Sequence, residues 1–238
     1  MAQSDFNFVG STNFIGGVEG TSALHALQSN PLTQEGIYCR SFSTTSDSAG
    51  VAARVKSTSF GGALVAIPNT KSVSVRAWLR STTWSSVGIS CKADTTSPTF
   101  NANSYGFGYH LVSSRSKVYN TTTTSLSLVC HGLVANTSDI VATSSDAVWT
   151  KVRMDVIPIN GNEGDKIMIY TGTGNTGSEV WTLLFAKTVI NNQAGYVPWN
   201  HATYKHTGFG AGLAYGGGSA TDESVVYIDR FQALLVNA

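Results

Sequence analysis

The closest approach to a pair of catalytic acids is the segment Glu163-Gly-Asp165-Lys-Ile-Met168. Glycoside hydrolysis needs two carboxyl groups that flank the scissile bond, one of them acting as the general acid. The segment follows Asn160-Gly-Asn, and such a polar Asn-Gly run is typical of a hairpin turn. A turn does not place both acids on one strand face, so we interpret Glu163 and Asp165 as turn residues rather than as a catalytic pair.

The same turn offers oxygen ligands for a calcium ion. Side-chain oxygens from Asn160, Asn162, Glu163 and Asp165 are of the type that Ca²⁺ prefers. The set lacks the full acidic loop of a dedicated calcium site, and Asn-Gly turns also serve as ordinary hairpin connections. A calcium site is therefore an alternative to a plain turn, and we expect no other cofactor.

Other residue patterns do not predict catalysis. The sequence has no Gly-x-Ser-x-Gly nucleophile elbow, and its five histidines lack the spacing of a zinc-protease motif. Cys130 and His131 are adjacent, so a strand would place them on opposite faces. We therefore expect that the protein is not an enzyme, with a divergent glycosidase as the alternative.

An aromatic loop over residues 196–206 is the main candidate for ligand binding. Aromatic rings can stack on sugar faces while Asn and His bond hydroxyl groups, and the same mixture forms hot spots at protein interfaces. A third interpretation is a long loop that packs its own aromatic rings. Trp149 and Trp181, in contrast, are predicted to lie in the core. The candidate ligand or interface residues are Tyr196, Trp199, Asn200, His201, Tyr204 and, from a second exposed segment, Trp84.

Composition limits the classes of partner. Charged residues make up 12% of the 238 residues, about half of the usual ~25%, and the formal net charge is +1. This balance predicts binding neither to nucleic acid nor to a membrane surface. The N-terminal segment lacks the features of a signal peptide, and no apolar run approaches the ~20 residues of a membrane span. The three cysteines have no metal or disulfide spacing, which favours buried thiols in a protein made in a reducing cytoplasm.

Alternation of apolar and polar residues predicts antiparallel sheets with one buried face. In the run 73–79 the odd-numbered residues are expected to point inward, and so are Val152, Met154 and Val156. Two further runs, residues 105–111 and 209–215, alternate glycine with large apolar residues. Repeated glycine in a strand indicates that another backbone or a ligand approaches closely.

These patterns predict an all-β fold of antiparallel strands, a sandwich or a barrel. Residues 1–35 are expected to form an N-terminal edge strand and an irregular arm, with a short helical turn at 23–27, and residues 36–238 a single domain. The predicted strands cover residues 36–43, 51–56, 62–67, 72–80, 87–93, 104–112, 125–133, 149–157, 166–170, 180–188, 206–215 and 224–235.

The part of the chain after residue 70 has a distinctive order of segments. A strand that opens with Trp149 is followed by the polar turn 160–165, a tryptophan strand at 179–185, a glycine-rich strand at 208–213 and a closing strand with Asp229. This order resembles the concanavalin A-like lectin and glucanase jelly roll, including laminin-G-like domains. The resemblance implies an antiparallel β-sandwich of the jelly-roll type with an irregular N-terminal arm. Folds of this class serve as lectins, glycosidases, adhesion modules and viral coat or fibre proteins, so the resemblance leaves the function open.

The function that we expect is that of a non-enzymatic virion protein, such as a bacteriophage head-decoration, fibre or tail component. Low charge, a Ser/Thr/Gly-rich surface and bare strand faces favour assembly with other virion proteins and with further copies of the chain. Such a protein is made in the host cytoplasm and is located in the virion. The alternative is a lectin-like module that binds host-surface glycans through residues 196–206.

Overall fold

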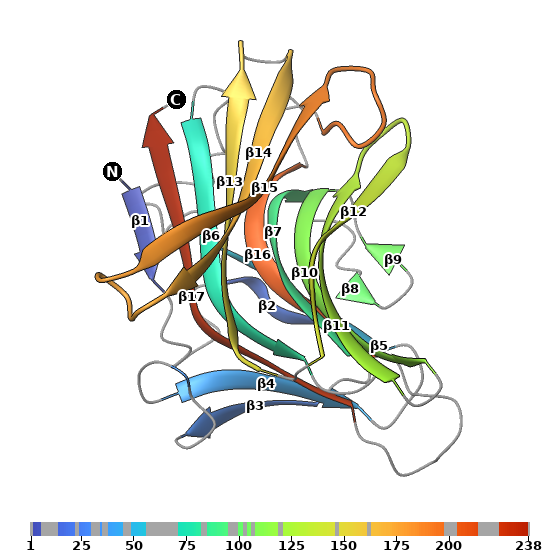
Figure 1. The fold of residues 1–238 in the computed structure, drawn as a ribbon, viewed down its shortest axis with the longest axis vertical. Helices are drawn as coiled ribbons and strands as arrows, with labels where there is room; N and C mark the ends of the chain where they lie inside the picture. Colours follow the sequence, from blue (N-terminus) through green and yellow to red (C-terminus); the bar gives the residue numbers. More distant parts are fainter. Residues whose placement is uncertain are drawn as a thin grey trace.

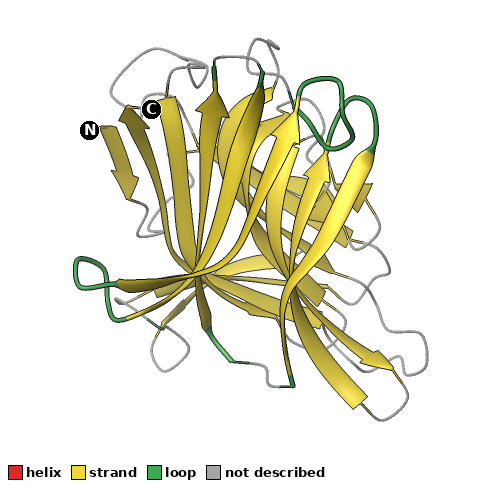
Figure 2. Cartoon of the chain, turned by 45° about the horizontal axis from the view of Figure 1, so that its top comes forward, coloured by secondary structure: helices red, strands yellow, loops and turns green. Residues whose placement is uncertain are grey.

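The computed structural model describes residues 2–5, 14–21, 24–29, 34, 38–44, 49–55, 71–81, 85–94, 100–101, 104–105, 108–118, 121–145, 148–160, 163–197, 204–213 and 224–237. Within these ranges the chain consists of strands and loops, with no helix (Figure 2). In particular, these residues form no helix that could cross a membrane.

Two antiparallel sheets face each other and form a β-sandwich (Figure 1), which confirms the predicted fold class. The first sheet has the order β15 (Val180–Ile190), β14 (Gly164–Thr173), β13 (Thr150–Ile159), β6 (Lys71–Ser81), β17 (Ser224–Asn237), β4 (Tyr38–Thr44) and β3 (Leu24–Ser29), with β1 (Ala2–Asp5) paired to β17. The second has the order β12 (Asn136–Ser144), β11 (Thr121–His131), β10 (Gly108–Val118), β7 (Ser85–Asp94), β16 (Tyr204–Leu213), β5 (Ala49–Val55) and β2 (Phe14–Thr21). β8 (Phe100–Asn101) and β9 (Ser104–Tyr105) form a small third sheet.

The N-terminal region contributes β1 and β3 to the first sheet and β2 to the second. β2 pairs with β5 at the edge of the second sheet, and β3 pairs with β4 at the edge of the first. The helical turn expected at residues 23–27 is wrong, because residues 24–27 belong to β3, whose backbone pairs with β4. A helix as short as this turn has little stability of its own, so pairing with a neighbouring strand decides its conformation. The domain division at residue 35 stays a prediction.

The core lies between the sheets, where the alternation placed it. Val73, Val75, Ala77 and Leu79 of β6 are 0–1% exposed, and Val152, Met154 and Val156 of β13 are fully buried. The free thiols of Cys91 and Cys130 are buried, as expected. The side chain of Cys39 is not among those described, and the strand predicted at 62–67 lies outside the described residues. β12 was not predicted, since its Ser- and Thr-rich sequence shows little apolar alternation.

The outward face of the first sheet is also partly covered. The β14–β15 hairpin crosses β13 and β6 in Figure 1, and Glu179 beside its tip lies 3.2 Å from Arg76 and 3.5 Å from Lys151. Trp149 and Trp181, predicted in the core, are instead half-buried. Lys151 and Arg153 lie over the Trp181 ring at 5.9 and 5.8 Å, so this ring packs against cations on the outer face.

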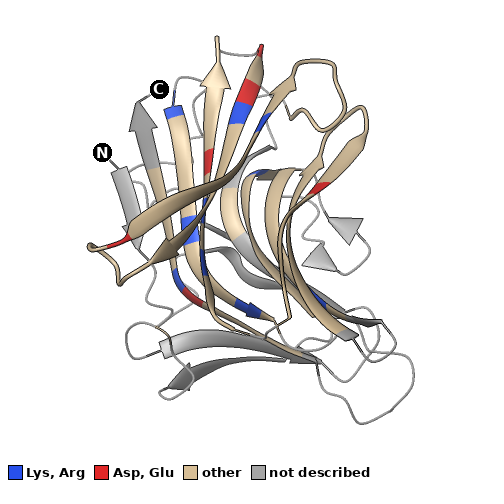
Figure 3. Ribbon diagram, in the orientation of Figure 1, with Lys and Arg blue, Asp and Glu red and all other residues tan. Residues whose placement is uncertain are grey.

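Charges are few and are spread over the described strands rather than gathered in one patch (Figure 3). Exposed large apolar side chains gather instead on the edge strand β15, at Val180, Leu183, Leu184 and Ile190, and the edge strand β12 adds Ile140 at 69% exposure. These two strands form the edges of the two sheets on the same side of the sandwich.

Gly108 confirms the close approach that the first glycine-alternating run predicted. Its φ is 141°, and a Cβ atom there would lie 2.9 Å from the Cα of Ala93 in β7. The side chains of the second run lie outside the described part, although its backbone in β16 pairs with both β7 and β5.

We expect Gly108→Ala to lower the free energy of unfolding by about 1–3 kcal/mol more than Gly177→Ala does. Both glycines have positive φ, but a Cβ at Gly177 would meet nothing within 4 Å, so this control isolates backbone strain from crowding. Urea denaturation of the two variants measures the difference. Equal losses of unfolding free energy in the two variants would show that Ala93 can move away from the added methyl group without destabilising the fold.

Candidate functional site

A buried ion pair joins the two sheets at one end of the sandwich. Lys92 of β7 donates from Nζ to Oδ2 of Asp165 in β14 at 2.7 Å, and the Tyr109 hydroxyl of β10 donates to the same oxygen at 2.5 Å. All three residues are fully buried. Since β7 and β10 belong to the second sheet and β14 to the first, one carboxylate oxygen is shared across the interior.

A bulge turns Lys92 into the interior. Between the pairs Ala93–His206 and Ser90–Gly208, two residues of β7 oppose one residue of β16, and Lys92 has a φ of 52°. A bulge breaks the regular alternation of side chains, so consecutive residues can face the same way. Cys91 and Lys92 are accordingly both fully buried. Sequence reasoning missed Lys92 because a regular strand would have placed it outside.

Burial governs the protonation of this cluster. It lowers the pKa of Lys92 from 10.5 to about 8, against the opposing effect of the Asp165 charge. Burial, followed by the charge of Asp165, raises the pKa of Tyr109 well above 10.0, so its hydroxyl stays protonated. The Lys92 ammonium lies 5.4 Å from the centroid of the Tyr109 ring and 5.2 Å from that of Tyr196.

The structure separates the predicted acid pair and the predicted calcium ligands. Glu163 is exposed in the hairpin turn and accepts a hydrogen bond from Asn160 Nδ2 at 2.8 Å, whereas Asp165 points into the core. Glu163 and Asp165 therefore do not flank a common substrate position, and Asp165 does not join Asn160 and Glu163 at one calcium position. Asn162 lies outside the described residues.

Tyr196 differs from its predicted role as an exposed ligand contact. It is 3% exposed, because its ring packs beside Lys92 in the core. Tyr204 belongs to β16, but its side chain is not described. Trp84, Trp199, Asn200 and His201 lie outside the described residues, so their roles stay predictions.

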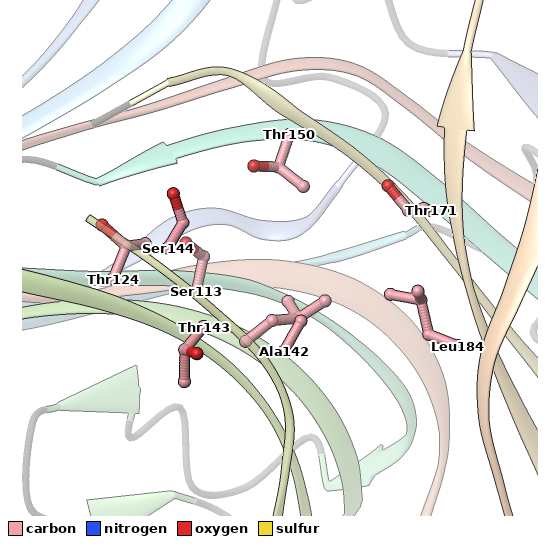
Figure 4. A pocket seen from close by; sticks show the side chains of 9 residues that line it. Ser113, Thr124, Ala142, Thr143, Ser144, Thr150, Thr171 and Leu184 are labelled. Atoms are coloured by element: carbon pink, nitrogen blue, oxygen red, sulfur yellow. The ribbon is translucent and has the colours of Figure 1, made fainter. Parts of the chain in front are cut away.

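A cleft of about 180 Å³ opens between the sheets at the end opposite the ion pair (Figure 4). In Figure 4, Thr150 and Thr171 of the first sheet lie across from Ser113 and Thr124 of the second. We call it the hydroxyl cleft; its lining residues are Ser113, Thr124, Leu126, Ala142, Thr143, Ser144, Thr150, Thr171 and Leu184.

The hydroxyl cleft forms because the inner faces of several strands change from aliphatic to hydroxyl residues at the same end. Alternation continues along each strand, but the next inward side chain is Ser or Thr. The changes are Leu111 to Ser113 in β10, Leu126 to Thr124 in β11, Val152 to Thr150 in β13, and Ile169 to Thr171 in β14. Each hydroxyl both donates and accepts hydrogen bonds, so the interior becomes polar at this end without carrying charge.

Hydrogen bonds position several of these hydroxyl groups. Arg115 donates to Thr124 Oγ1 at 2.7 Å, and the Ser81 and Ser113 hydroxyls lie 3.3 Å apart. The Thr171 hydroxyl donates to the Lys151 carbonyl oxygen at 3.3 Å. A hydroxyl group offers one donor and two acceptor positions, so a single contact does not exhaust its capacity.

Side chains of the two edge strands meet beside the cleft. Lys187 of β15 donates to Asp139 at 2.6 Å and to Thr137 at 2.8 Å, both in β12. Within the cleft itself, Leu184 of β15 lies opposite Ala142 of β12. Lys187 thus bridges the two sheets, and farther along the same edge strands, β12 and β15, the sheets leave the space of the hydroxyl cleft.

Comparisons with known proteins return distant structural likenesses. No family model matches the chain, and no curated protein matches it. The chain is similar to the botulinum neurotoxin serotype D ligand-binding domain, solved with N-acetylneuraminic acid, at 11% identity and a TM-score of 0.47 over 100% of this chain and 48% of that one. It is also similar to the lectin UEA-II, solved with galactose, at 8% identity and a TM-score of 0.47 over 98% of both chains. The chain spans about half the length of the neurotoxin domains. Identities this low carry no information about a shared ligand.

We expect Lys92→Met to lower the free energy of unfolding by about 3–5 kcal/mol, because it leaves the buried Asp165 carboxylate without its cation. Lys187→Met is the matched control. Its pair with Asp139 is partly exposed, so its loss should cost about 1 kcal/mol or less. Urea denaturation compares the two variants. Equal losses of unfolding free energy would show that the buried pair stabilises the fold no more than the partly exposed pair does.

Stability should also fall with rising pH through Cys130. Burial raises the pKa of this thiol from 9.0 to about 12, so above pH 9 the unfolded chain loses the proton first while the folded chain keeps it. Between about pH 9 and 11 the wild type should therefore lose more stability than Cys130→Ser. Because both proteins contain Lys92 and the buried tyrosines, the comparison cancels those groups. Parallel pH profiles would contradict the prediction.

Proposed function

We propose that the chain is a non-catalytic binding module that holds a polyhydroxyl ligand, one sugar residue of a glycan, in the hydroxyl cleft. The observation that carries this proposal is the change from aliphatic to hydroxyl side chains at the same end of β10, β11, β13 and β14. A gap left by imperfect packing would not require both sheets to replace aliphatic by hydroxyl side chains at the same end.

The lining of the cleft matches the two kinds of surface on a sugar ring. Leu126, Ala142 and Leu184 offer apolar contacts to the C–H groups of the sugar. The serines and threonines offer hydrogen bonds to the hydroxyl groups of the sugar, which need partners once they are buried. A volume of about 180 Å³ is below the ~300–1,000 Å³ of pockets for drug-sized ligands. The cleft therefore suits one sugar residue, with the rest of a glycan outside the mouth.

Binding without catalysis follows from the residue types. The residues that line the cleft are Ser, Thr, Leu and Ala, none of which is an acid or base at neutral pH. A Ser or Thr hydroxyl needs an adjacent general base to become a nucleophile. Glycoside hydrolysis would need two carboxyl groups at this place.

The expected virion role and the expected self-association stay predictions. One observation favours a protein partner as a second function, namely the exposed apolar side chains of β12 and β15, such as Ile140 and Val180. Apolar groups of this kind at sheet edges favour association with another chain. Glycan binding and assembly are compatible, because a virion protein can do both.

A glycan array probed with the full chain, followed by calorimetric titration of the best glycan, tests the proposal. The double variant Thr150→Val/Thr171→Val keeps the side-chain shapes but removes two hydroxyl groups, so we expect about tenfold weaker binding or more. The control Thr188→Val changes an exposed threonine of β15 outside the cleft and should bind as the wild type does. Thermal melting confirms that each variant is folded.

Two outcomes would contradict the proposal. The first is an array with no bound glycan, and the second is a glycan whose affinity is the same for the wild type and the double variant. The second outcome would direct attention to residues 198–203, which belong to the aromatic loop predicted at 196–206.

A further inference from the structure

Lys92 and Asp165 are a buried amine and carboxylate that the proposed glycan site does not use. Lys92 Nζ lies 2.7 Å from Asp165 Oδ2, both side chains are 0% exposed, and the two residues belong to opposite sheets. We propose that this pair is a modification site, at which Lys92 and Asp165 condense to an amide that cross-links the two sheets.

The geometry allows direct proton transfer between the two reactants. Lys92 Nζ already donates a hydrogen bond to Asp165 Oδ2 at 2.7 Å, so one proton can pass from the amine to the carboxylate without a bridging water. The buried rings of Tyr109 and Tyr196 lie beside Nζ and exclude water from it. Burial also lowers the pKa of Lys92 to about 8, so the unprotonated, nucleophilic amine forms at lower pH than for an exposed lysine.

The reaction balances without an oxidant, metal or cofactor. After the first proton transfer, the Nζ lone pair forms a bond to Cγ of Asp165 and gives a tetrahedral intermediate. Nζ then gives up a second proton, the bond between Cγ and one oxygen breaks, and that oxygen leaves with both protons as water. An ammonium group with three hydrogens and a carboxylate thereby become one amide N–H and one water molecule.

Tyr109 is placed to assist the departure of water. Its hydroxyl donates to Asp165 Oδ2 at 2.5 Å, the same oxygen that Lys92 contacts, so it can pass a proton to the leaving oxygen and receive one from the nitrogen side. The backbone N–H of Val197 donates to the Tyr109 hydroxyl oxygen at 3.2 Å and holds it in place. Tyr109 is thus a proton relay between the two reacting groups.

The fold supplies the proximity that drives condensation. Lys92 is fixed by the β7 bulge and Asp165 by its place in β14, so the two groups meet without further loss of freedom. Well-oriented intramolecular reactants reach effective concentrations of about 10⁵–10⁸ M. The water that is released leaves a site enclosed by core side chains, which opposes hydrolysis. The product closes a loop between positions 73 residues apart.

Mass spectrometry of the denatured, reduced wild-type chain decides the proposal. We expect an intact mass lower than the sequence mass by one water, and a branched peptide after proteolysis that joins the segments holding Lys92 and Asp165. An intact mass equal to the sequence mass would overturn the proposal. So would a loss of water that maps elsewhere, for example to a succinimide formed by another aspartate of the chain.

Three variants provide controls. Lys92→Arg keeps the positive charge but removes the nucleophilic amine, so it should show the full sequence mass, whereas Lys187→Arg at the partly exposed pair should retain the cross-link. Tyr109→Phe should form the cross-link about a hundredfold more slowly in a time course after refolding. An unchanged rate would overturn the relay step. If a variant fails to fold, the mass of the wild-type chain still decides.

Discussion

The contact of Lys92, Tyr109 and Asp165 is the constraint on which the rest of the sandwich depends. A single carboxylate oxygen receives hydrogen bonds from two strands of the opposite sheet, and all three side chains are fully buried. Neither a buried ion pair nor the proposed amide tolerates displacement of its partners, because separation would leave a buried charge without compensation or break a covalent bond. The contact therefore fixes how β7 and β10 lie against β14.

From this fixed end, the inner faces of the strands run through an aliphatic core to a polar end. Along β10 the inward residues are Tyr109 beside the ion pair, Leu111 in the core and Ser113 in the hydroxyl cleft. Along β14 the order is the same, from Asp165 in the ion pair through two core isoleucines to Thr171 in the cleft. One end of the sandwich is thus held by the contact of Lys92, Tyr109 and Asp165, and the other is left open by hydroxyl groups. This polarity separates the part that stabilises the fold from the part that we assign to ligand binding.

Sequence reasoning predicted the fold from local alternation and missed what depends on contacts between strands. The buried faces of β6 and β13 follow period two, so residues such as Val75 and Met154 were predictable. Lys92 was not, because a bulge reverses its direction, and Asp165 was assigned to a turn that ends just before it. The hydroxyl cleft was missed because its serines and threonines are ordinary surface residues until the sheet register brings them together.

The central claim is that a sugar residue binds between the sheets at the hydroxyl cleft. Methyl NMR of threonine-labelled protein, titrated with the glycan that binds best, tests the claim most directly because it locates the ligand. The account predicts chemical-shift changes concentrated at Thr124, Thr143, Thr150 and Thr171, with Thr188 unchanged. Changes confined to threonines elsewhere, such as Thr203 in the aromatic loop, would contradict it.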